Sequence, residues 1–276
     1  MKKLISILLV LLMLCSVVIM SACSDPDDND DNTDDPSNSQ SQNAQKLIED
    51  SIKKINDLDS YYAIMTQDIH LSMQGVSMDM PVTVSIKVQD ATTANPKMYA
   101  IQDMQMLGQN ITTELYIDGD YIYLDSNGYQ AKISKDEIGD TDQLSYDKTL
   151  EELLLVLPDD VMNDIIVKIN ESGNRYVEVD FDSAKFLEFY ESNIEDISSS
   201  INASIDDLQI SDSKVKIVLD KSGYVKEYVL TYKMSISTQG QTANADVNLK
   251  IEFIDPGKSV TVTPMEGYQN FPLIDY

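Results

Sequence analysis

Hydrophobic residues recur with two different periods along the body of the chain. Between residues 44 and 58 they recur every three or four positions, which predicts an amphipathic helix. From Tyr61 the period changes to two, so that successive side chains alternate between an apolar and a polar face, as in half-buried strands. Four such strands are predicted, over residues 61–74, 78–88, 97–107 and 110–118. The body therefore opens with one helix and continues as a sheet.

Two tight turns are predicted in the stretch "YIDGDYIYLDSNGYQAKI", residues 116–133. Asp-Gly and Asn-Gly are strong signals for type I′ hairpins, because both central residues of such a turn need a positive φ. A short strand over 121–124 follows the first turn, and another over 129–133 follows the second turn. A calcium-binding loop would also use these acidic residues, but with Gly128 as its central glycine the first position is Tyr123 and the twelfth is Ser134. Neither residue has a carboxylate, so the sequence favours the two turns.

The second half of the chain returns to the helical period before a final set of strands. Helices are predicted over 147–157 and, with a longer apolar stripe, over 183–208. Between them, "DIIVKINESGNRYVEVDF" predicts a hairpin that turns at residues 172–173, although residues 161–169 also fit a second helix. Three closing strands are predicted over 213–220, 223–238 and 242–254, with turns at Ser222-Gly223 and Gln239-Gly240.

Together these elements predict an α+β fold in which about ten or eleven antiparallel strands form one large curved sheet. An open sheet of that size curls, and its concave face must be filled. We therefore expect a half-barrel with the helices packed on its concave face. No boundary signal interrupts residues 44–276, so this segment is expected to form a single domain.

The first residues have the layout of a secretory signal peptide. Two lysines precede an apolar run over residues 4–20, and small residues follow it. The sequence "MSAC", residues 20–23, resembles the lipobox of bacterial lipoproteins, in which the cysteine becomes a diacylated N-terminus. That resemblance implies a diacylglyceryl group on Cys23, and two acyl chains suffice for stable membrane attachment. An uncleaved membrane span is the alternative, but the run is shorter than the ~20 residues that a span needs.

A strongly acidic segment follows the cysteine. Residues 24–42 contain seven Asp, two Pro and no aliphatic or aromatic residue, which predicts a disordered tether because so little apolar surface cannot offset the chain entropy. A calcium-binding acidic run is the alternative. The expected organisation is a signal peptide over 1–22, a lipidated cysteine and tether over 23–43, and a domain over 44–276 at the outer face of the cell membrane.

The charge balance narrows the possible partners. The formal net charge is −27, and removing two lysines with the signal peptide and seven Asp with the tether leaves −22 on residues 44–276. So acidic a body repels nucleic acid and anionic lipid headgroups. Nucleic-acid binding is therefore not expected, and a charged protein partner in the cell envelope would be basic.

The layout as a whole resembles the Lol-type lipoprotein carriers (LolA) and their mycobacterial LppX-like relatives. The shared features are a diacylated Cys23, an acidic tether, a first amphipathic helix, long one-faced strands and a helical insertion before the final strands. The chain is most similar to uncharacterised Gram-positive lipoproteins with methionine-rich early strands and a Y-x-x-x-G-x-Y-x-Y hairpin. Tyr116, Tyr121 and Tyr123 match that hairpin, with Asp120 in place of the glycine. The resemblance implies a half-barrel around a cavity that can hold acyl chains, although some relatives bind a protein and regulate envelope signalling.

Signals for catalysis are lacking in the sequence. The single histidine, His70, lies on the polar face of its predicted strand with Asp68 and Ser72. No nucleophile-elbow, zinc-protease, phosphate-loop or dinucleotide-binding pattern occurs. After loss of the signal peptide the only cysteine is the lipidated Cys23, which excludes thiol chemistry. We therefore expect no enzymatic activity, no catalytic residue and no cofactor.

Methionines are the most informative side chains of the predicted sheet. Thirteen are present, and ten remain when those of residues 1–20 are removed; two Met-x-Met pairs place both thioethers on one strand face. Thioethers suit Cu(I), so copper binding is a minor alternative, although no histidine lies near to complete a metal site. Flexible methionine also lines adaptable apolar surfaces. The residues expected to line a cavity are Met78, Met80, Val82, Val84, Met104, Met106, Tyr232 and Met234.

Two functions remain compatible with the sequence. The first is a carrier or sensor that holds a lipid or other hydrophobic ligand in the cavity of the curved sheet. The second is a non-enzymatic interaction or regulatory lipoprotein with a filled core and a protein partner in the envelope. An apolar strand face has the same pattern whether it packs on a helix or on an acyl chain, so both functions stay open at this point.

Overall fold

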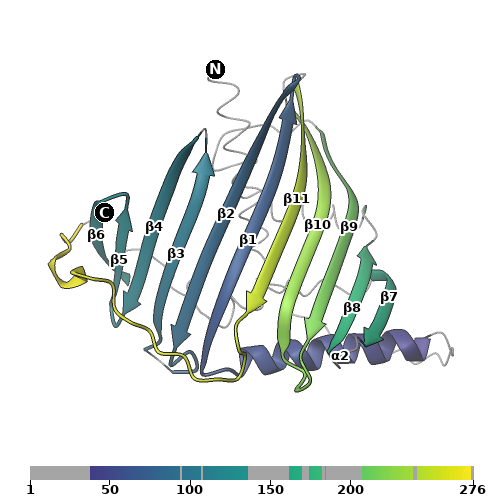
Figure 1. The fold of residues 1–276 in the computed structure, drawn as a ribbon, viewed down its shortest axis with the longest axis horizontal. Coiled ribbons are helices and arrows are strands. Elements are labelled where there is room, and N and C mark those ends of the chain that lie inside the picture. The colour runs from purple at the N-terminus through teal and green to yellow at the C-terminus, as the bar shows by residue number, and fades with distance from the viewer. Residues whose placement is uncertain are drawn as a thin grey trace.

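The strands form one antiparallel sheet of eleven members in the order β6-β5-β4-β3-β2-β1-β11-β10-β9-β8-β7 (Figure 1). This structure is a computed structural model, and it describes residues 38–93, 95–106, 108–135, 162–169, 174–181, 184, 207–238 and 241–274. The first meander comprises β1 (Ser60–Met73), β2 (Val76–Gln89), β3 (Lys97–Met106), β4 (Gln109–Asp118), β5 (Tyr121–Ser126) and β6 (Tyr129–Ser134). The second comprises β7 (Met162–Ile169), β8 (Arg175–Phe181), β9 (Asp207–Leu219), β10 (Val225–Thr238) and β11 (Gln241–Phe253). The two meanders meet where β1 pairs with β11.

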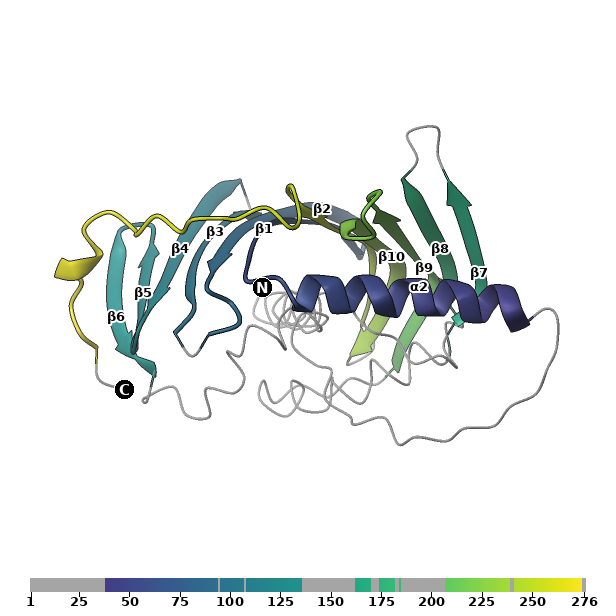
Figure 2. The ribbon, with the colours of Figure 1, turned by 90° about the horizontal axis from the view of Figure 1, so that it is seen from below.

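The sheet is curved, and alternation of side chains gives it a concave and a convex face (Figure 2). In β1 every second residue from Tyr61 to Met73 is buried, as the period of two predicts. The pairing register aligns the apolar residues of neighbouring strands. For example, Ile69 lies opposite Met80 of β2 and Val247 of β11. The predicted α+β class, with a large curved antiparallel sheet, is confirmed.

Helix α2 (Asn38–Asn56) lies on the concave side of the sheet, at the lower ends of β7 to β10 in Figure 1, and crosses in front of these strands in Figure 2. Its apolar stripe places Ile52 and Ile55 in the main core with the concave-face residues of the strands. At its end, Lys54 Nζ donates a hydrogen bond to the carbonyl of Ser222 and lies 5.7 Å from the centre of the Tyr224 ring. The helix begins six residues before the predicted start at 44, because polar residues can extend a helix through backbone hydrogen bonds without an apolar stripe.

The hairpin turns account for most of the acidic residues in the stretch 116–133. At the second turn Asn127 and Gly128 both have positive φ, 48° and 86°, as a type I′ turn requires. Asp125 closes this turn, because its carboxylate accepts the Gly128 N–H at 2.8 Å and the Gln130 side chain at 2.8 Å. At the first turn only Gly119 has a positive φ, 60°, so the type I′ prediction is wrong there and the geometry is that of a type II′ turn.

Strand β9 begins earlier than the sequence pattern predicts. Residues 207 and 208 belong to this strand, so the predicted helix 183–208 is wrong at its end. The register of β9 against β10 shifts near Asp212, which has a φ of 56°. Before this β-bulge the buried residues have even numbers, Leu208 and Ile210, and after it they have odd numbers, Ser213 and Val215. The change interrupts the period of two and hides the start of the strand in the sequence.

The hairpin of β7 and β8 confirms the strand interpretation of its sequence and excludes the alternative helix over 162–169. Other predictions lie outside the described residues. They are the signal peptide, the tether up to residue 37, the helix over 147–157, the turn at residues 172–173, most of the helix over 183–208 and the turn at Gln239-Gly240.

The C-terminal residues 254–274, called the C-terminal strap here, cross the convex side from β11 to β6 (Figure 1, yellow). Early in the strap, Ile254 N donates to the carbonyl of Tyr62 at 2.8 Å, and Val260 N donates to Ser60 Oγ at 2.9 Å. At the end of the strap, Leu273 pairs with Lys132 of the edge strand β6. The Lys132 N–H donates to the carbonyl of Pro272, and the Ile274 N–H donates to the carbonyl of Lys132. The strap therefore covers part of an edge that would otherwise present unpaired backbone groups.

Candidate functional site

The concave face is the candidate site because it is apolar and carries almost no charge in a strongly acidic chain. The exposed Arg175 of β8, opposite Leu219, is a charged residue at the margin of this face. Among the described side chains of β1–β6, β9 and β11, no Asp, Glu, Lys or Arg lies on this face. The same holds for β10 after the bulge at its start. The charged residues of these strands lie on the convex face. Lys250, for example, contacts Glu227 and Glu252 there at 3.2 Å each.

Burial divides the concave face into two halves. On β1 and β9–β11 its described side chains are buried and belong to the main core, on the side where α2 packs. On β2–β6 many apolar side chains of the same face stay half-exposed. We call this second region the open half, and its half-exposed members are Met78, Val84, Ile86, Met98, Met104, Ile111, Leu115, Leu124 and Ile133. An apolar surface of this kind is suited to a hydrophobic ligand.

The predicted cavity-lining residues lie on this one face. Val82 of β2 lies directly opposite Met104 of β3, and Met78, Met80 and Val84 point to the same side as Val82. Two cross-strand rows connect them to β10, namely Tyr232-Val247-Ile69-Met80 and Met234-Ala245-Leu71-Met78. The structure does not describe the side chain of Met106, whose backbone ends β3.

The same residues differ in exposure. Met78, Val84 and Met104 are half-exposed, whereas Met80, Tyr232 and Met234 are buried, with 1–2% of their surface exposed. The alternation in the sequence therefore identifies which residues lie on the concave face. The role of these residues in lining a cavity stays a prediction.

His70 is separated from the methionine pairs by the thickness of the sheet. It lies on the convex face, as predicted, with its Nδ1 2.6 Å from Asp79 Oδ1. The hydrogen bond to Asp79 raises the pKa of His70 above 6.5. It cannot complete a copper site with Met78 and Met80 on the opposite face. Among the described residues, no group of three or more His, Cys, Asp or Glu side chains is arranged to hold a metal ion.

Sequence reasoning missed the polar side chains within the concave face. Gln67 and Ser213 are both buried there, and Tyr228 of β10 is only 1% exposed. The Tyr228 and Ser213 hydroxyls have no hydrogen-bond partner in the described part of the chain. Burial alone raises the pKa of Tyr228, so that its hydroxyl stays protonated. A polar residue at an apolar position of a strand, such as Gln67, is the signal that could have found this group.

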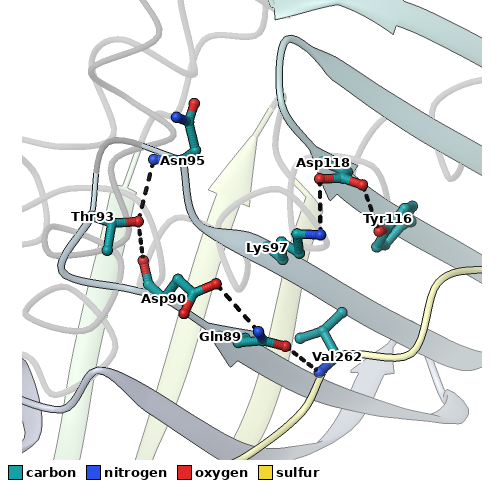
Figure 3. Close-up of polar contacts among 8 residues, drawn as sticks. All are labelled: Gln89, Asp90, Thr93, Asn95, Lys97, Tyr116, Asp118 and Val262. Atoms are coloured by element: carbon teal, nitrogen blue, oxygen red, sulfur yellow. Dashed lines mark hydrogen bonds and ion pairs between the residues drawn. The ribbon is translucent and has the colours of Figure 1, made fainter.

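A second cluster, on the convex face, forms between tyrosines of β4 and β5 and apolar residues of the C-terminal strap. Its buried members are Tyr116, Tyr123, Val262, Met265 and Phe271. The Tyr116 hydroxyl donates to Asp118 at 2.9 Å, and Lys97 lies 3.5 Å from the other oxygen of that carboxylate (Figure 3). The strap is fixed nearby, since Val262 N donates to the Gln89 side chain at 3.0 Å (Figure 3). These polar groups bind one another, which is the arrangement of a structural cluster rather than a reactive one.

No helix in the described part of the chain combines the length and the apolar character needed to cross a bilayer.

Comparisons with known proteins give a family and several distant structures. Residues 43–264 match the family model described as "Family of unknown function (DUF6612)". No curated protein matches the sequence. Similar solved structures include LprF from Mycobacterium bovis, with 15% identity, a TM-score of 0.39 and coverage of 81% of this chain and 97% of that one. They also include the LolA superfamily protein NE2245 from Nitrosomonas europaea, with 9% identity, a TM-score of 0.22 and coverage of 77% and 94%.

The proteins that this chain resembles thus include a LolA superfamily member and a mycobacterial Lpr protein, as the sequence layout predicts. The superpositions are loose, so they carry no information on ligand or activity.

Proposed function

The chain belongs to the DUF6612 family of unknown function, and we propose that it is a membrane-anchored lipoprotein that binds a hydrophobic ligand. In this proposal a diacylglyceryl group on Cys23 holds the protein at the outer face of the cell membrane. The ligand, a lipid or another apolar molecule, binds on the concave face of the sheet. The protein acts as a carrier or sensor and catalyses no reaction.

One observation carries this proposal: a continuous apolar face whose described side chains are uncharged from β6 to β11 and whose open half is not fully covered. Half-exposed apolar side chains gather there from five neighbouring strands, β2 to β6. Soluble proteins bury most such surfaces, and a contiguous exposed apolar patch marks a binding site. The flexible thioethers of Met78 and Met104 allow this surface to adapt to ligands of different shape.

The alternative, an interaction or regulatory lipoprotein with a filled core, is favoured by the other half of the same face. The concave-face side chains of β1 and β9–β11 form a continuous buried core with α2. If the open half is likewise closed in solution, the protein retains no ligand. A partner in the envelope would then have to bind elsewhere on the surface.

Native mass spectrometry separates the two functions. The full-length chain is prepared with Cys23→Ala, so that no covalently attached lipid interferes, and is purified gently. A carrier retains an extractable ligand, and Met104→Trp reduces the retained fraction because the larger side chain fills the half-exposed surface. The matched control is Gln105→Trp, at an exposed position next along β3. A clean apo mass for the parent protein refutes ligand binding and favours the alternative.

The anchor has its own test. A Cys23→Ala chain made in a bacterium that processes lipoproteins is compared with the parent chain by fractionation and by metabolic labelling with a fatty acid. Loss of both the label and the membrane association is expected, because Cys15, the other cysteine, follows the bulky Leu14 and has no small residue before it. Unchanged membrane association of the variant would exclude the proposed anchor.

A further inference from the structure

Two buried hydroxyls on neighbouring strands lack a hydrogen-bond partner among the described residues. They belong to Tyr228 of β10, 1% exposed, and Ser213 of β9, 3% exposed. A hydroxyl that leaves water without gaining a partner destabilises the folded state, and native proteins keep few such groups. Each one therefore requires an explanation.

Both hydroxyls belong to the concave face. Tyr228 lies opposite Ile251 of β11 and Ile217 of β9 and is part of the main core. Ser213 reaches the same face because of the bulge at Asp212. Without the bulge, the alternation from Leu208 and Ile210 would bring residue 212 to this face instead. A β-bulge that re-aims one side chain is a common device beside binding sites.

The bulge also keeps a negative charge off this face. The carboxylate of Asp212 lies on the convex side, where Lys233 Nζ donates to it at 2.7 Å. The concave face thus receives a neutral hydroxyl in place of a carboxylate. An anionic group brought beside Tyr228 would lose its hydration, and Arg175, the cation that the strand register places on this face, is exposed at the start of β8 opposite Leu219.

We propose that the Tyr228 hydroxyl hydrogen-bonds the uncharged polar group of the ligand, such as the ester carbonyl of a neutral acyl lipid. Ser213 lies four residues along β9 from Ile217, the partner of Tyr228, at a backbone separation of about 13 Å, and it offers a hydroxyl to a second polar group of the same ligand. Its hydrocarbon chain extends across the concave face toward the open half. Four inter-strand steps separate β10 from β3, and at ~4.8 Å each they span about 19 Å, a distance on the scale of a long acyl chain. This inference rests on the proposed function and adds the chemical class of the ligand to it.

Three probes with the same pyrene-labelled chain test the proposal. They are a fatty acid, its methyl ester and the corresponding alkane, each titrated into the full-length Cys23→Ala chain and followed by pyrene fluorescence. The methyl ester is expected to bind most tightly, since only it combines an acceptor with zero charge. Tyr228→Phe should weaken ester binding about fivefold, the usual effect of one neutral hydrogen bond, and leave alkane binding unchanged. The control is Tyr62→Phe, on the convex face, which should change neither.

The outcomes distinguish this inference from the proposed function. If none of the three probes binds the parent chain, ligand binding itself is refuted. If the probes bind but Tyr228→Phe affects the ester and the alkane equally, only the role of the hydroxyl is overturned. A melting experiment adds a readout independent of binding. Without ligand, Tyr228→Phe should raise the melting temperature because an unpaired buried hydroxyl is removed, whereas a lower melting temperature would reveal a structural partner and overturn the inference.

Discussion

The contact between the C-terminal strap and the tyrosines of β4 and β5 can be tested by truncating Phe271 to alanine. Phe271 is 6% exposed, and its ring centre lies 6.4 Å from that of Tyr123 in an edge-on arrangement. Beyond it, the strap ends in the backbone pairing with Lys132 of β6. Phe271 is therefore the last buried side chain before the covered edge of the sheet.

The expected loss follows from this burial. Replacing a buried Phe by Ala costs roughly 3–5 kcal/mol when the surroundings cannot close over the cavity. Phe271 belongs to a strap without regular strand structure on the surface of the sheet, where side chains can shift more readily than in the central core. We therefore expect a loss near the lower limit, about 3 kcal/mol of unfolding free energy. Tyr123 loses one aromatic neighbour and keeps Tyr268, whose ring centre is 4.8 Å away.

Urea unfolding, followed by tyrosine fluorescence, measures this loss. The chain contains fifteen tyrosines and no tryptophan, so no tryptophan emission masks the signal. The matched control is Leu273→Ala, at a side chain that is 56% exposed, which should change stability by less than about 0.5 kcal/mol. Hydrogen exchange at Lys132 N should accelerate in Phe271→Ala. Equal losses for the two variants would refute the anchoring role of Phe271.

Two further predictions concern the docking of α2 and the convex-face ion pair. At Gly223 a new Cβ would lie 2.8 Å from Lys54 Nζ, whereas at Gly75 it would meet nothing within 4 Å, and both residues have positive φ. Each change to Ala should cost about 1–2 kcal/mol of unfolding free energy through backbone strain. Gly223→Ala should cost about 1 kcal/mol more, because it displaces the Lys54 ammonium from its carbonyl acceptor. Urea unfolding of the two glycine variants should show this excess, and it must vanish when they are compared in a Lys54→Ala background. The raised pKa of His70 means that its pairing stabilises the fold below a pH of about 6.5 and loses that effect as the pH rises through the folded-state pKa. NMR titration of this single histidine should show its pKa falling in Asp79→Asn, and a pKa at or below 6.5 in the parent chain would contradict the pairing.

The long strands and their faces follow from the sequence because the side chains alternate without interruption. In β1 and β2 the period of two identifies the buried residues correctly, including Met80 and Val82. The Asn127-Gly128 turn is equally predictable, because few residues other than these tolerate two successive positive φ angles. The shared face of the predicted site residues follows from the same alternation.

Other features depend on contacts between distant residues and have no local signal. The start of β9 is hidden because the bulge at Asp212 interrupts the alternation. The C-terminal strap has no periodicity, and its position depends on contacts such as Val262 N with Gln89. The docking of α2 near β7 and β10 also has no local signal, because it involves Lys54 and a carbonyl far along the chain. The orphan hydroxyl of Tyr228 is likewise visible only when its neighbours are known.

The pairing of β1 with β11 also determines the order in which the sheet can be completed during synthesis. Each meander pairs consecutive strands, and all of these connections except the one between β8 and β9 close short loops that can form early. The central pair, in which Ala63 lies opposite Phe253, joins the first described strand to the last and must wait until β11 has been made. Until then β1 and β10 each have an open edge that can pair with another chain. Such non-local pairing is slow to form, so a chaperone that shields these two strands would act at the most vulnerable step of folding.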